Sequence, residues 1–331
     1  GSAYWLACTN HQFNGSPIHD LLYSKLNRYG LQKLIDRHFY HIYIDYQKHP
    51  HAALPPLEQV EFPHAHFSEY KNMQLAGRGG MAEVYKADHP TLKRTVAVKI
   101  MRESIQDDPI MRLFFERETR ALSRLDHPNV IKVLDVGRVD DRPYLVMEFV
   151  DGPILSALLA GGRLELNEAL AILKPIGAAL DYLHAHHVIH RDVKPGNILV
   201  EDRNGQRRPI LTDFGLAKVL GDTSLISQSA VAGTLAYIAP EQIEAQKHID
   251  GRADIYALGV MTYQLLSGQL PFQFENQGAL LIAHMLHAPP DIRERVSELA
   301  DSVSRAIQRA MSKKPVDRFA TAGEFVGALA S

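Results

Sequence analysis

The sequence predicts an α+β protein with two lobes, a small β-rich lobe followed by a larger helical lobe. Short runs of β-branched and aromatic residues, separated by glycine-containing turns, dominate residues 67–150. From residue 151 onward, apolar residues recur instead at helical spacing. The two patterns meet at Asp151 and Gly152, and we expect a cleft between the lobes, which is a preferred place for a ligand.

The composition is that of an ordinary globular chain. Its 331 residues are 46% hydrophobic and 22% charged, and the formal net charge of −2 gives no electrostatic reason to expect nucleic acid as a partner. The single cysteine, Cys8, excludes a disulfide framework and favours a reducing, cytoplasmic setting. No apolar run reaches the ~18 residues of a membrane-spanning helix. We therefore expect no membrane segment in this sequence, although the full-length protein could be anchored beyond Ser331.

Residues 1–66 differ from the rest and predict a short helical extension. Ser16 and Pro17 are typical of a helix start, and apolar residues recur at helical spacing over 18–29 and 31–42. A proline-containing linker follows this hairpin. Two short helices cannot form a stable core alone, so we expect the extension to dock on the remaining chain or on a second copy in a homodimer, in a regulatory role.

The same extension also carries a zinc hypothesis. Cys8 and His11, together with His38 and His41, have the residue types and spacing of a tetrahedral Zn²⁺ site. The alternative is a polar, histidine-rich surface. We favour that alternative because His38 lies on the apolar face of its predicted helix.

The small lobe begins with a glycine-rich turn between two strands. The turn contains Gly77, Arg78, Gly79 and Gly80. Its glycines allow the backbone to approach phosphate oxygens and to direct N–H groups at them. An ordinary hairpin is the alternative for this turn taken alone. The predicted elements of the lobe are strands over 70–77, 82–87, 95–101, 131–137 and 144–148 and a helix over 110–125.

The strand over 95–101 contains a lysine, Lys99, among apolar residues. A buried lysine requires an anion, either a carboxylate or a phosphate. Glu116 and Glu118 in the following helix are the candidate carboxylates. We favour Glu118 because Leu122, one turn later, shares its helix face and would point into the core.

The segment IHRDVKPGNIL, residues 189–199, carries the predicted chemistry. Asp192 is the candidate base that orients an attacking hydroxyl, and Lys194 would neutralise a transferring phosphoryl group. Asn197 would offer a neutral oxygen to a divalent cation. Asp213, at the end of the next strand, would offer that cation a carboxylate. The predicted helices around this segment are 166–187, 253–267, 277–287, 299–312 and 321–330.

With these motifs in order, the chain resembles the bacterial Hanks-type (eukaryotic-like) serine/threonine protein kinases over residues 67–331. The resemblance implies the bilobal protein kinase fold, with 67–150 as the N-lobe and 151–331 as the C-lobe. It also implies ATP-dependent phosphorylation of proteins in intracellular signalling, with Mg²⁺ or Mn²⁺ as the cation. The motifs that carry it are GRGGMAEVY, VAVK ending at Lys99, Glu118, HRD at 190–192, DFG at 213–215 and IAPE at 238–241.

The resemblance also implies where the nucleotide lies. The glycine-rich loop and Lys99 would hold its phosphates. Met147 would be the gatekeeper residue, and the backbone of Glu148 and Val150 would meet the adenine. The residues implied to sandwich the adenine ring are Val84, Ala97 and Leu199.

Further features imply a protein acceptor and a regulatory switch. Arg318 is the implied partner of Glu241. Asp254 would hold the backbone of the catalytic loop, which lies within residues 189–199. Lys194 with Thr234 implies serine or threonine as the acceptor. Arg191 is implied to pair with a phosphorylated residue of the activation loop, where the candidates are Thr223, Ser224, Ser227 and Ser229, with Ser227 or Ser229 favoured.

Two other functions remain as alternatives to an active protein kinase. One is a pseudokinase or scaffold, which is disfavoured because none of the expected catalytic residues is replaced. The other is a small-molecule kinase, which is disfavoured by the segment that ends in Ala239, Pro240 and Glu241, and by Asp254 and Arg318.

Overall fold

The computed structural model describes most of the chain after residue 69, and the described residues belong to one compact unit, Phe62–Ser331. The helical hairpin, linker and zinc hypothesis of residues 1–66 therefore lie outside the described residues. Among the helices in the described part of the chain, none is long and apolar enough to cross a membrane. The described ranges are 70–79, 82–103, 115, 119, 122–139, 142–203, 205–214, 235–244, 246 and 248–331.

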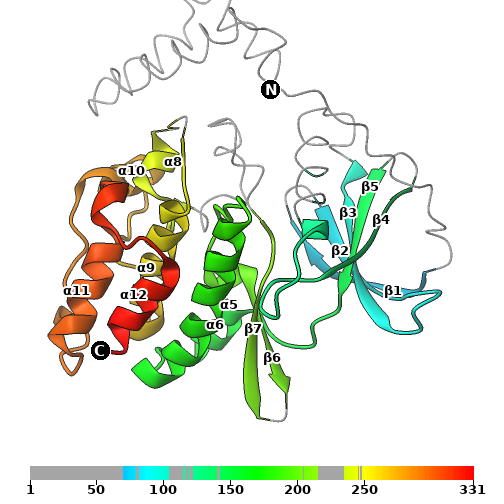
Figure 1. Ribbon diagram of the computed structural model, residues 1–331, viewed down its shortest axis with the longest axis horizontal. Helices are drawn as coiled ribbons and strands as arrows, with labels where there is room; N and C mark the ends of the chain where they lie inside the picture. Colours follow the sequence, from blue (N-terminus) through cyan, green and yellow to red (C-terminus); the bar gives the residue numbers. More distant parts are fainter. Residues whose placement is uncertain are drawn as a thin grey trace, which may run out of the picture. The chain divides into compact units, whose positions relative to one another are not determined.

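The N-lobe contains a five-stranded antiparallel sheet with the strand order β1-β2-β3-β5-β4 (Figure 1). Each strand predicted from the sequence is confirmed to within two residues at either end. Within the predicted helix over 110–125, Phe115, Thr119, Leu122 and Ser123 are helical. The strands are β1 (Lys71–Arg78), β2 (Ala82–Asp88), β3 (Thr95–Met101), β4 (Val133–Val139) and β5 (Arg142–Glu148).

The pairing register of this sheet places the lysine of β3 among the residues predicted to meet a nucleotide. Lys99 lies opposite Val84 on β2 and Leu145 on β5, and Ala97 lies opposite Met147. Paired residues share one face of a sheet, as do residues two apart on one strand. These five side chains therefore lie on one face, and Leu145 and Met147 join the large core of the helical lobe. The opposite face carries a separate apolar cluster centred on Val96, Val98, Ile100, Tyr144 and Val146.

Residues 149–154 form the linker from the sheet to the helices, and this linker runs close to strand β6 (Ile198–Arg203). A Cβ atom on Gly152 would lie 2.1 Å from the carbonyl oxygen of Val200, so only glycine allows this approach. The backbone N–H of Val200 donates to the Pro153 carbonyl at 2.9 Å, and Ile154 forms a bridge with Leu199. The linker is thereby attached to the strand that follows the catalytic loop.

The helical lobe is arranged around α9 (Arg252–Ser267). Thirteen of its sixteen residues are buried, as expected of a helix that other elements surround on all sides. Its neighbours include α6, α11 and α12. Every helix predicted for this lobe is confirmed to within two residues at either end: α6 (Leu166–Ala185), α9, α10 (Gln277–Leu286), α11 (Asp301–Ala310) and α12 (Ala322–Leu329).

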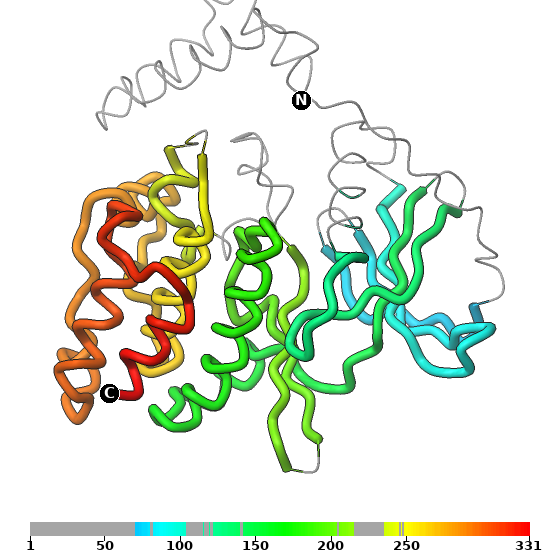
Figure 2. Tube along the Cα trace, viewed as in Figure 1, coloured from blue at the N-terminus to red at the C-terminus, as the bar shows by residue number. Residues whose placement is uncertain are grey.

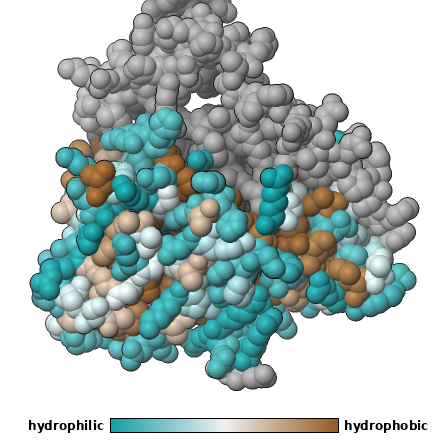
Figure 3. Space-filling model, in the orientation of Figure 1, coloured by the Kyte–Doolittle hydropathy of each residue, from teal (hydrophilic) through white to brown (hydrophobic). Residues whose placement is uncertain are grey.

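The lobe also contains two strands that the sequence indicated without bounds, one after the catalytic segment and one before Asp213, and several short helices that it did not predict. Strand β6 pairs with β7 (Gln206–Leu211) in an antiparallel hairpin, which Figure 2 shows between the helices and the N-lobe sheet. Figure 3 shows a mainly hydrophilic described surface, with apolar residues gathered over the sheet and near α8 and α10. The short helices and helical turns are α5 (Leu155–Leu158), η4 (Leu159–Gly161), η5 (Pro195–Asn197), α8 (Pro240–Ile243), η8 (Ile292–Glu294) and η9 (Pro315–Asp317).

A buried ion pair joins α8 to the end of the helical lobe, and it confirms the predicted partnership of Glu241 and Arg318. Both residues are at most 3% exposed, and the guanidinium makes a bidentate contact with the carboxylate at 2.6 and 2.8 Å. The other three N–H groups of Arg318 donate to the carbonyl oxygens of Arg252, Ser312 and Lys313. All five donors are satisfied, so the buried charge is compensated completely.

Replacing Arg318 with alanine is expected to destabilise the protein by about 3–5 kcal/mol, because the Glu241 carboxylate would remain buried without a counter-charge. The free energy of unfolding in urea measures this loss. Arg305→Ala is the matched control. It removes an exposed ion pair with Asp301 within α11 and is expected to change stability by less than ~0.5 kcal/mol. Equal effects of the two substitutions would contradict the assignment.

Candidate active site

The catalytic loop is held by one buried carboxylate, that of Asp254 on α9. Its Oδ1 accepts the backbone N–H of Arg191 at 2.7 Å, and its Oδ2 accepts the backbone N–H of His190 at 2.9 Å. Oδ2 also contacts Nε2 of His184 on α6 at 2.8 Å. These contacts confirm the prediction that Asp254 holds the backbone of the loop.

The electrostatics of this contact favour a charged pair. Burial raises the pKa of the Asp254 carboxyl, but the hydrogen bond and charge of His184 outweigh burial, and the net shift is downward. Burial lowers the pKa of His184, and the Asp254 carboxylate reverses that shift, so its net pKa is raised. Gly251 permits the contact, because a Cβ atom there would lie 2.4 Å from the His184 ring.

The His190 ring connects the catalytic loop to the segment that carries Asp213. Its Nδ1 accepts the backbone N–H of Asp192 at 3.3 Å, and its Nε2 lies 3.0 Å from the Thr212 carbonyl oxygen. A neutral imidazole with its proton on Nε2 satisfies both contacts. Phe214 stacks on this ring at a centroid distance of 4.7 Å and is 3% exposed. The orientation of the two segments is therefore set by buried contacts.

The three polar residues predicted on the catalytic loop lie together. Nζ of Lys194 donates to Oδ2 of Asp192 at 2.8 Å. The amide nitrogen of Asn197 donates to the same oxygen at 2.9 Å and to the Asp192 carbonyl at 2.8 Å. It also lies 3.3 Å from the Asp213 carbonyl oxygen. These contacts orient both the Asp192 carboxylate and the Asn197 amide, whose oxygen points away from the three acceptors.

Lys99 and Asp213 join the two lobes at the site. Nζ of Lys99, a residue only 9% exposed, lies 3.1 Å from Oδ1 of Asp213. The positive charge of Lys99 lowers the pKa of the Asp213 carboxyl, which is therefore ionised at neutral pH. Asp213 has a left-handed backbone with φ of 54°. Such strain in a non-glycine residue is common at functional sites.

Arg191 is a second strained residue in the loop, with φ of 64°. Its backbone carbonyl accepts from the side chain of Gln242 at 3.2 Å. Its Nε atom is buried and has no hydrogen-bond partner among the described residues. Burial lowers the pKa of its guanidinium, and the Asp254 carboxylate opposes that shift. The result is a partly buried cation with unused capacity for an anion.

The glycine-rich turn is described only in part. Gly77 and Gly79 are present, and the Gly79 N–H closes the turn on the Ala82 carbonyl at 2.9 Å. Arg78 pairs with Glu83 across the hairpin at 2.8 Å. The methyl group of Ala82, where a further glycine is usual, is buried in the large core. Several predicted residues lie outside the described part: Gly80, Glu116, Glu118, Thr223, Ser224, Ser227, Ser229 and Thr234.

The residues predicted around the adenine are described and lie on strands β2, β3, β5 and β6 and on the linker after β5. Val84 and Ala97 share the sheet face that carries Lys99, and Met147 is 9% exposed beside them. Val150 is buried in the linker after β5, and Leu199 lies on β6. The backbone N–H of Glu148 donates to the Lys132 carbonyl at 2.9 Å.

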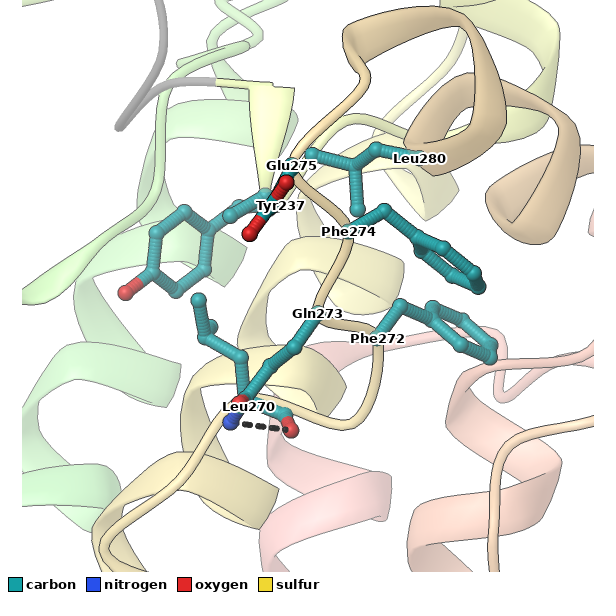
Figure 4. A pocket seen from close by; sticks show the side chains of 8 residues that line it. Tyr237, Leu270, Phe272, Gln273, Phe274, Glu275 and Leu280 are labelled. Carbon is teal, nitrogen blue, oxygen red and sulfur yellow. Dashed lines mark hydrogen bonds between the residues drawn. The ribbon is translucent and has the colours of Figure 1, made fainter.

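An open pocket of about 480 Å³ lies in the helical lobe, between the segment just before α8 and the loop that joins α9 to α10 (Figure 4). Tyr237 forms one wall, and Phe272 and Phe274 project together from the loop between α9 and α10. Burial raises the pKa of Tyr237, and the charge of Asp192 adds to the shift. The lining of the pocket is largely aromatic and aliphatic.

The sequence reasoning missed His184, Gly251 and Thr212. His184 lies at the end of α6, where a histidine is usual on the surface, and its partner Asp254 is 70 residues away in the chain. No local pattern shows that a ring will lie against Gly251. Thr212 contributes through its backbone, which any residue would supply.

The sequence model of the protein kinase domain family matches residues 70–326. The chain belongs to the protein kinase domain family. Its members include the serine/threonine-protein kinase PknJ of Mycobacterium tuberculosis, which is 38% identical over 268 residues, covering 80% of this chain and 45% of PknJ. The chain thus spans about half the length of this curated relative.

Solved structures of the kinase family agree with the fold. The PknI kinase domain of M. tuberculosis superposes with a TM-score of 0.63 at 31% identity, covering 78% of this chain and 95% of that domain. A structure of Rad53 in complex with AMP-PNP superposes with a TM-score of 0.64 at 27% identity, covering 78% of this chain and 64% of that one. Both comparisons support the predicted bilobal α+β kinase fold.

Proposed function

We propose that this kinase domain transfers the γ-phosphoryl group of ATP to serine and threonine hydroxyls of proteins, in intracellular signalling. One observation carries the proposal. The Asp192 carboxylate is oriented by Lys194 and Asn197, and the Lys99–Asp213 pair joins the other lobe to the same site. Phosphoryl transfer requires a hydroxyl-orienting base, phosphate-binding cations and metal ligands in one place.

The residues present fit a divalent cation, Mg²⁺ or alternatively Mn²⁺. The Asp213 carboxylate is about half exposed and ionised, and the Asn197 amide directs its oxygen away from its three hydrogen-bond acceptors. Both are oxygen ligands of the kind a hard cation prefers. When bound, such a cation neutralises charge on the phosphate oxygens of the nucleotide.

The side chains of the site divide the remaining work among them. Asp192 would accept the hydrogen bond of the acceptor hydroxyl at its carboxylate and later take up the proton. Lys194, whose ammonium already bonds Asp192, would stabilise charge on the phosphoryl group as it moves. Lys99 would hold phosphate oxygens beside the glycine-rich turn. Glu118 is proposed as a further carboxylate partner for Lys99.

The nucleotide base is proposed to bind against the sheet face that carries Lys99. Val84 and Ala97 would cover one side of the adenine and Leu199 the other, with Met147 at the inner end. Backbone groups of Glu148 and Val150 would bond to its edge. Gly77, Arg78, Gly79 and Gly80 would cover the phosphates.

The pocket beside Tyr237 supports a protein as the acceptor. It is open and largely apolar, and its Tyr237 feels the charge of Asp192, and so it suits the side chains of an extended polypeptide better than a small polar molecule. The chain is further proposed to act in the cytoplasm. Self-association into a homodimer, as proposed from the sequence, would place two such sites in one assembly.

Autophosphorylation of the activation loop is proposed from the state of Arg191. A partly buried guanidinium with an unpaired Nε gains charge-assisted hydrogen bonds when a phosphate group approaches. Thr223, Ser224, Ser227 and Ser229 are the candidate phosphate carriers, and Ser227 and Ser229 are favoured. Phosphorylation would order this segment against the catalytic loop.

Asp192→Asn is expected to lower the rate of phosphate transfer to a protein substrate by ~10²–10⁴, because an amide cannot accept the hydroxyl proton. The measurement is incorporation of labelled phosphate at saturating Mg-ATP. Asp202→Asn, on the exposed part of β6, is the matched control and should retain the wild-type rate.

Equal incorporation by wild type and Asp192→Asn would contradict the role of Asp192. Phosphate transfer only to small molecules would contradict the protein acceptor, and ATP binding without transfer would indicate a pseudokinase.

Incubation of the wild-type chain with Mg-ATP is expected to add phosphate to residues within 220–234. Peptide mass spectrometry locates the modification, and Asp192→Asn serves as the control that should remain unmodified. An unmodified loop after prolonged incubation of an active wild-type protein would contradict autophosphorylation there.

A further inference from the structure

We propose that Arg208 is a positioning residue for nucleotide binding. It lies on β7, one residue before Pro209, and reaches from the helical lobe to two segments of the N-lobe. The proposal rests on the proposed function, since it assigns Arg208 an effect on the nucleotide site through Glu148. Arg208 itself would touch neither nucleotide nor acceptor.

The guanidinium of Arg208 contacts three separate segments. Its Nε donates to the Pro128 carbonyl, in the loop before β4, at 2.8 Å. Its Nη1 donates to Oε2 of Glu201 on β6 at 3.2 Å, and its Nη2 lies 3.5 Å from Oε1 of Glu148 at the end of β5. The side chains of Arg208, Glu148 and Glu201 are only 18–21% exposed. Water therefore screens these contacts less than it screens a surface ion pair.

Glu148 connects this cluster to the proposed adenine site. Its backbone N–H bonds the Lys132 carbonyl at 2.9 Å, and its Oε1 accepts the Lys132 N–H at 3.3 Å. The Lys132 N–H and the Arg208 guanidinium thus both contact Oε1 of the Glu148 carboxylate. The Glu148 backbone, whose carbonyl would bond adenine, is fixed together with its own side chain.

Removal of Arg208 would change the charge balance at this point. The guanidinium lies between the carboxylates of Glu148 and Glu201 and attracts both. Without it, the Glu201 carboxylate still has Arg203 at 2.6 Å, whereas the Glu148 carboxylate keeps only the Lys132 N–H among its described hydrogen bonds. The end of β5 would therefore be less firmly held, while β6 would be little affected.

The surrounding join between the lobes does not depend on Arg208. The Ile131 N–H donates to the Leu211 carbonyl at 3.0 Å, and the Leu211 N–H donates to the Asn129 carbonyl at 2.9 Å. The Asn129 side chain bonds the Pro209 carbonyl at 2.8 Å. These contacts run along β7 and remain when Arg208 is replaced. The variant should therefore fold, and its effect should be confined to the end of β5.

The test measures the affinity of the full chain for AMP-PNP with Mg²⁺ by calorimetry. Arg208→Ala is expected to raise the dissociation constant about fivefold, the size of a typical coupling between contacting residues. Arg208→Lys should have a smaller effect, because an ammonium keeps the charge but cannot make all three contacts.

Arg203→Ala is the matched control. It removes a partner of the same Glu201 without reaching β5, and it should bind as wild type does. At saturating ATP the rate of phosphate transfer by Arg208→Ala should stay within about twofold of wild type, since Asp192 and Lys194 are untouched.

Wild-type affinity in Arg208→Ala would overturn the proposal. Equal weakening by Arg208→Ala and Arg203→Ala would also overturn it, because the effect would then be general. If the wild-type chain fails to bind AMP-PNP, the proposed function is contradicted. The role of Arg208 is then tested by amide hydrogen exchange of residues 148–150, measured without nucleotide. Faster exchange in Arg208→Ala supports that role, and unchanged exchange overturns it.

Discussion

The candidate active site depends on the buried carboxylate of Asp254. One side chain accepts two consecutive backbone N–H groups of the catalytic loop and a third contact from His184. A carboxylate this deeply buried is tolerated only because it is paired and hydrogen-bonded. It fixes the backbone at Arg191 in a left-handed conformation, and this sets the direction in which Asp192 leaves the helical core.

Backbone contacts at β7 help to join the two lobes, and the proposed active site lies at the end of that strand. Asp213 follows β7 by two residues and pairs with Lys99 of the sheet. Thr212, between them, receives the His190 ring. The proposed base and metal ligands thus lie on one strand end and one loop, and the contact between Lys99 and Asp213 links them to the sheet. A small displacement of either would separate them, and a displacement of about 1 Å is enough to slow catalysis strongly.

Much of this arrangement could be predicted from the sequence, because strands such as 95–101 and helices such as 253–267 carry strong periodicity. The contacts of Asp254 and of the Glu241–Arg318 pair were predicted from the family resemblance. Local sequence patterns could not predict them, because their partners lie 64 and 77 residues apart in the chain. His184 and Arg208 could not be predicted, because each acts on partners far along the chain. Their residue types alone are compatible with an ordinary surface. The β6–β7 hairpin was missed as a unit because arginines and a proline occupy β7, which weakens its strand pattern.

The central claim is that Asp254 holds the catalytic loop in its active geometry, and Asp254→Asn tests it most directly. An asparagine offers one acceptor oxygen in place of two, so one backbone N–H of the loop must lose its partner. The measurement combines phosphate transfer at saturating Mg-ATP with amide hydrogen exchange at residues 190–192, and AMP-PNP binding shows that the variant is folded. We expect faster exchange and a rate lower by ~10²-fold, with nucleotide affinity retained. A folded variant with wild-type exchange and a wild-type rate would contradict the account.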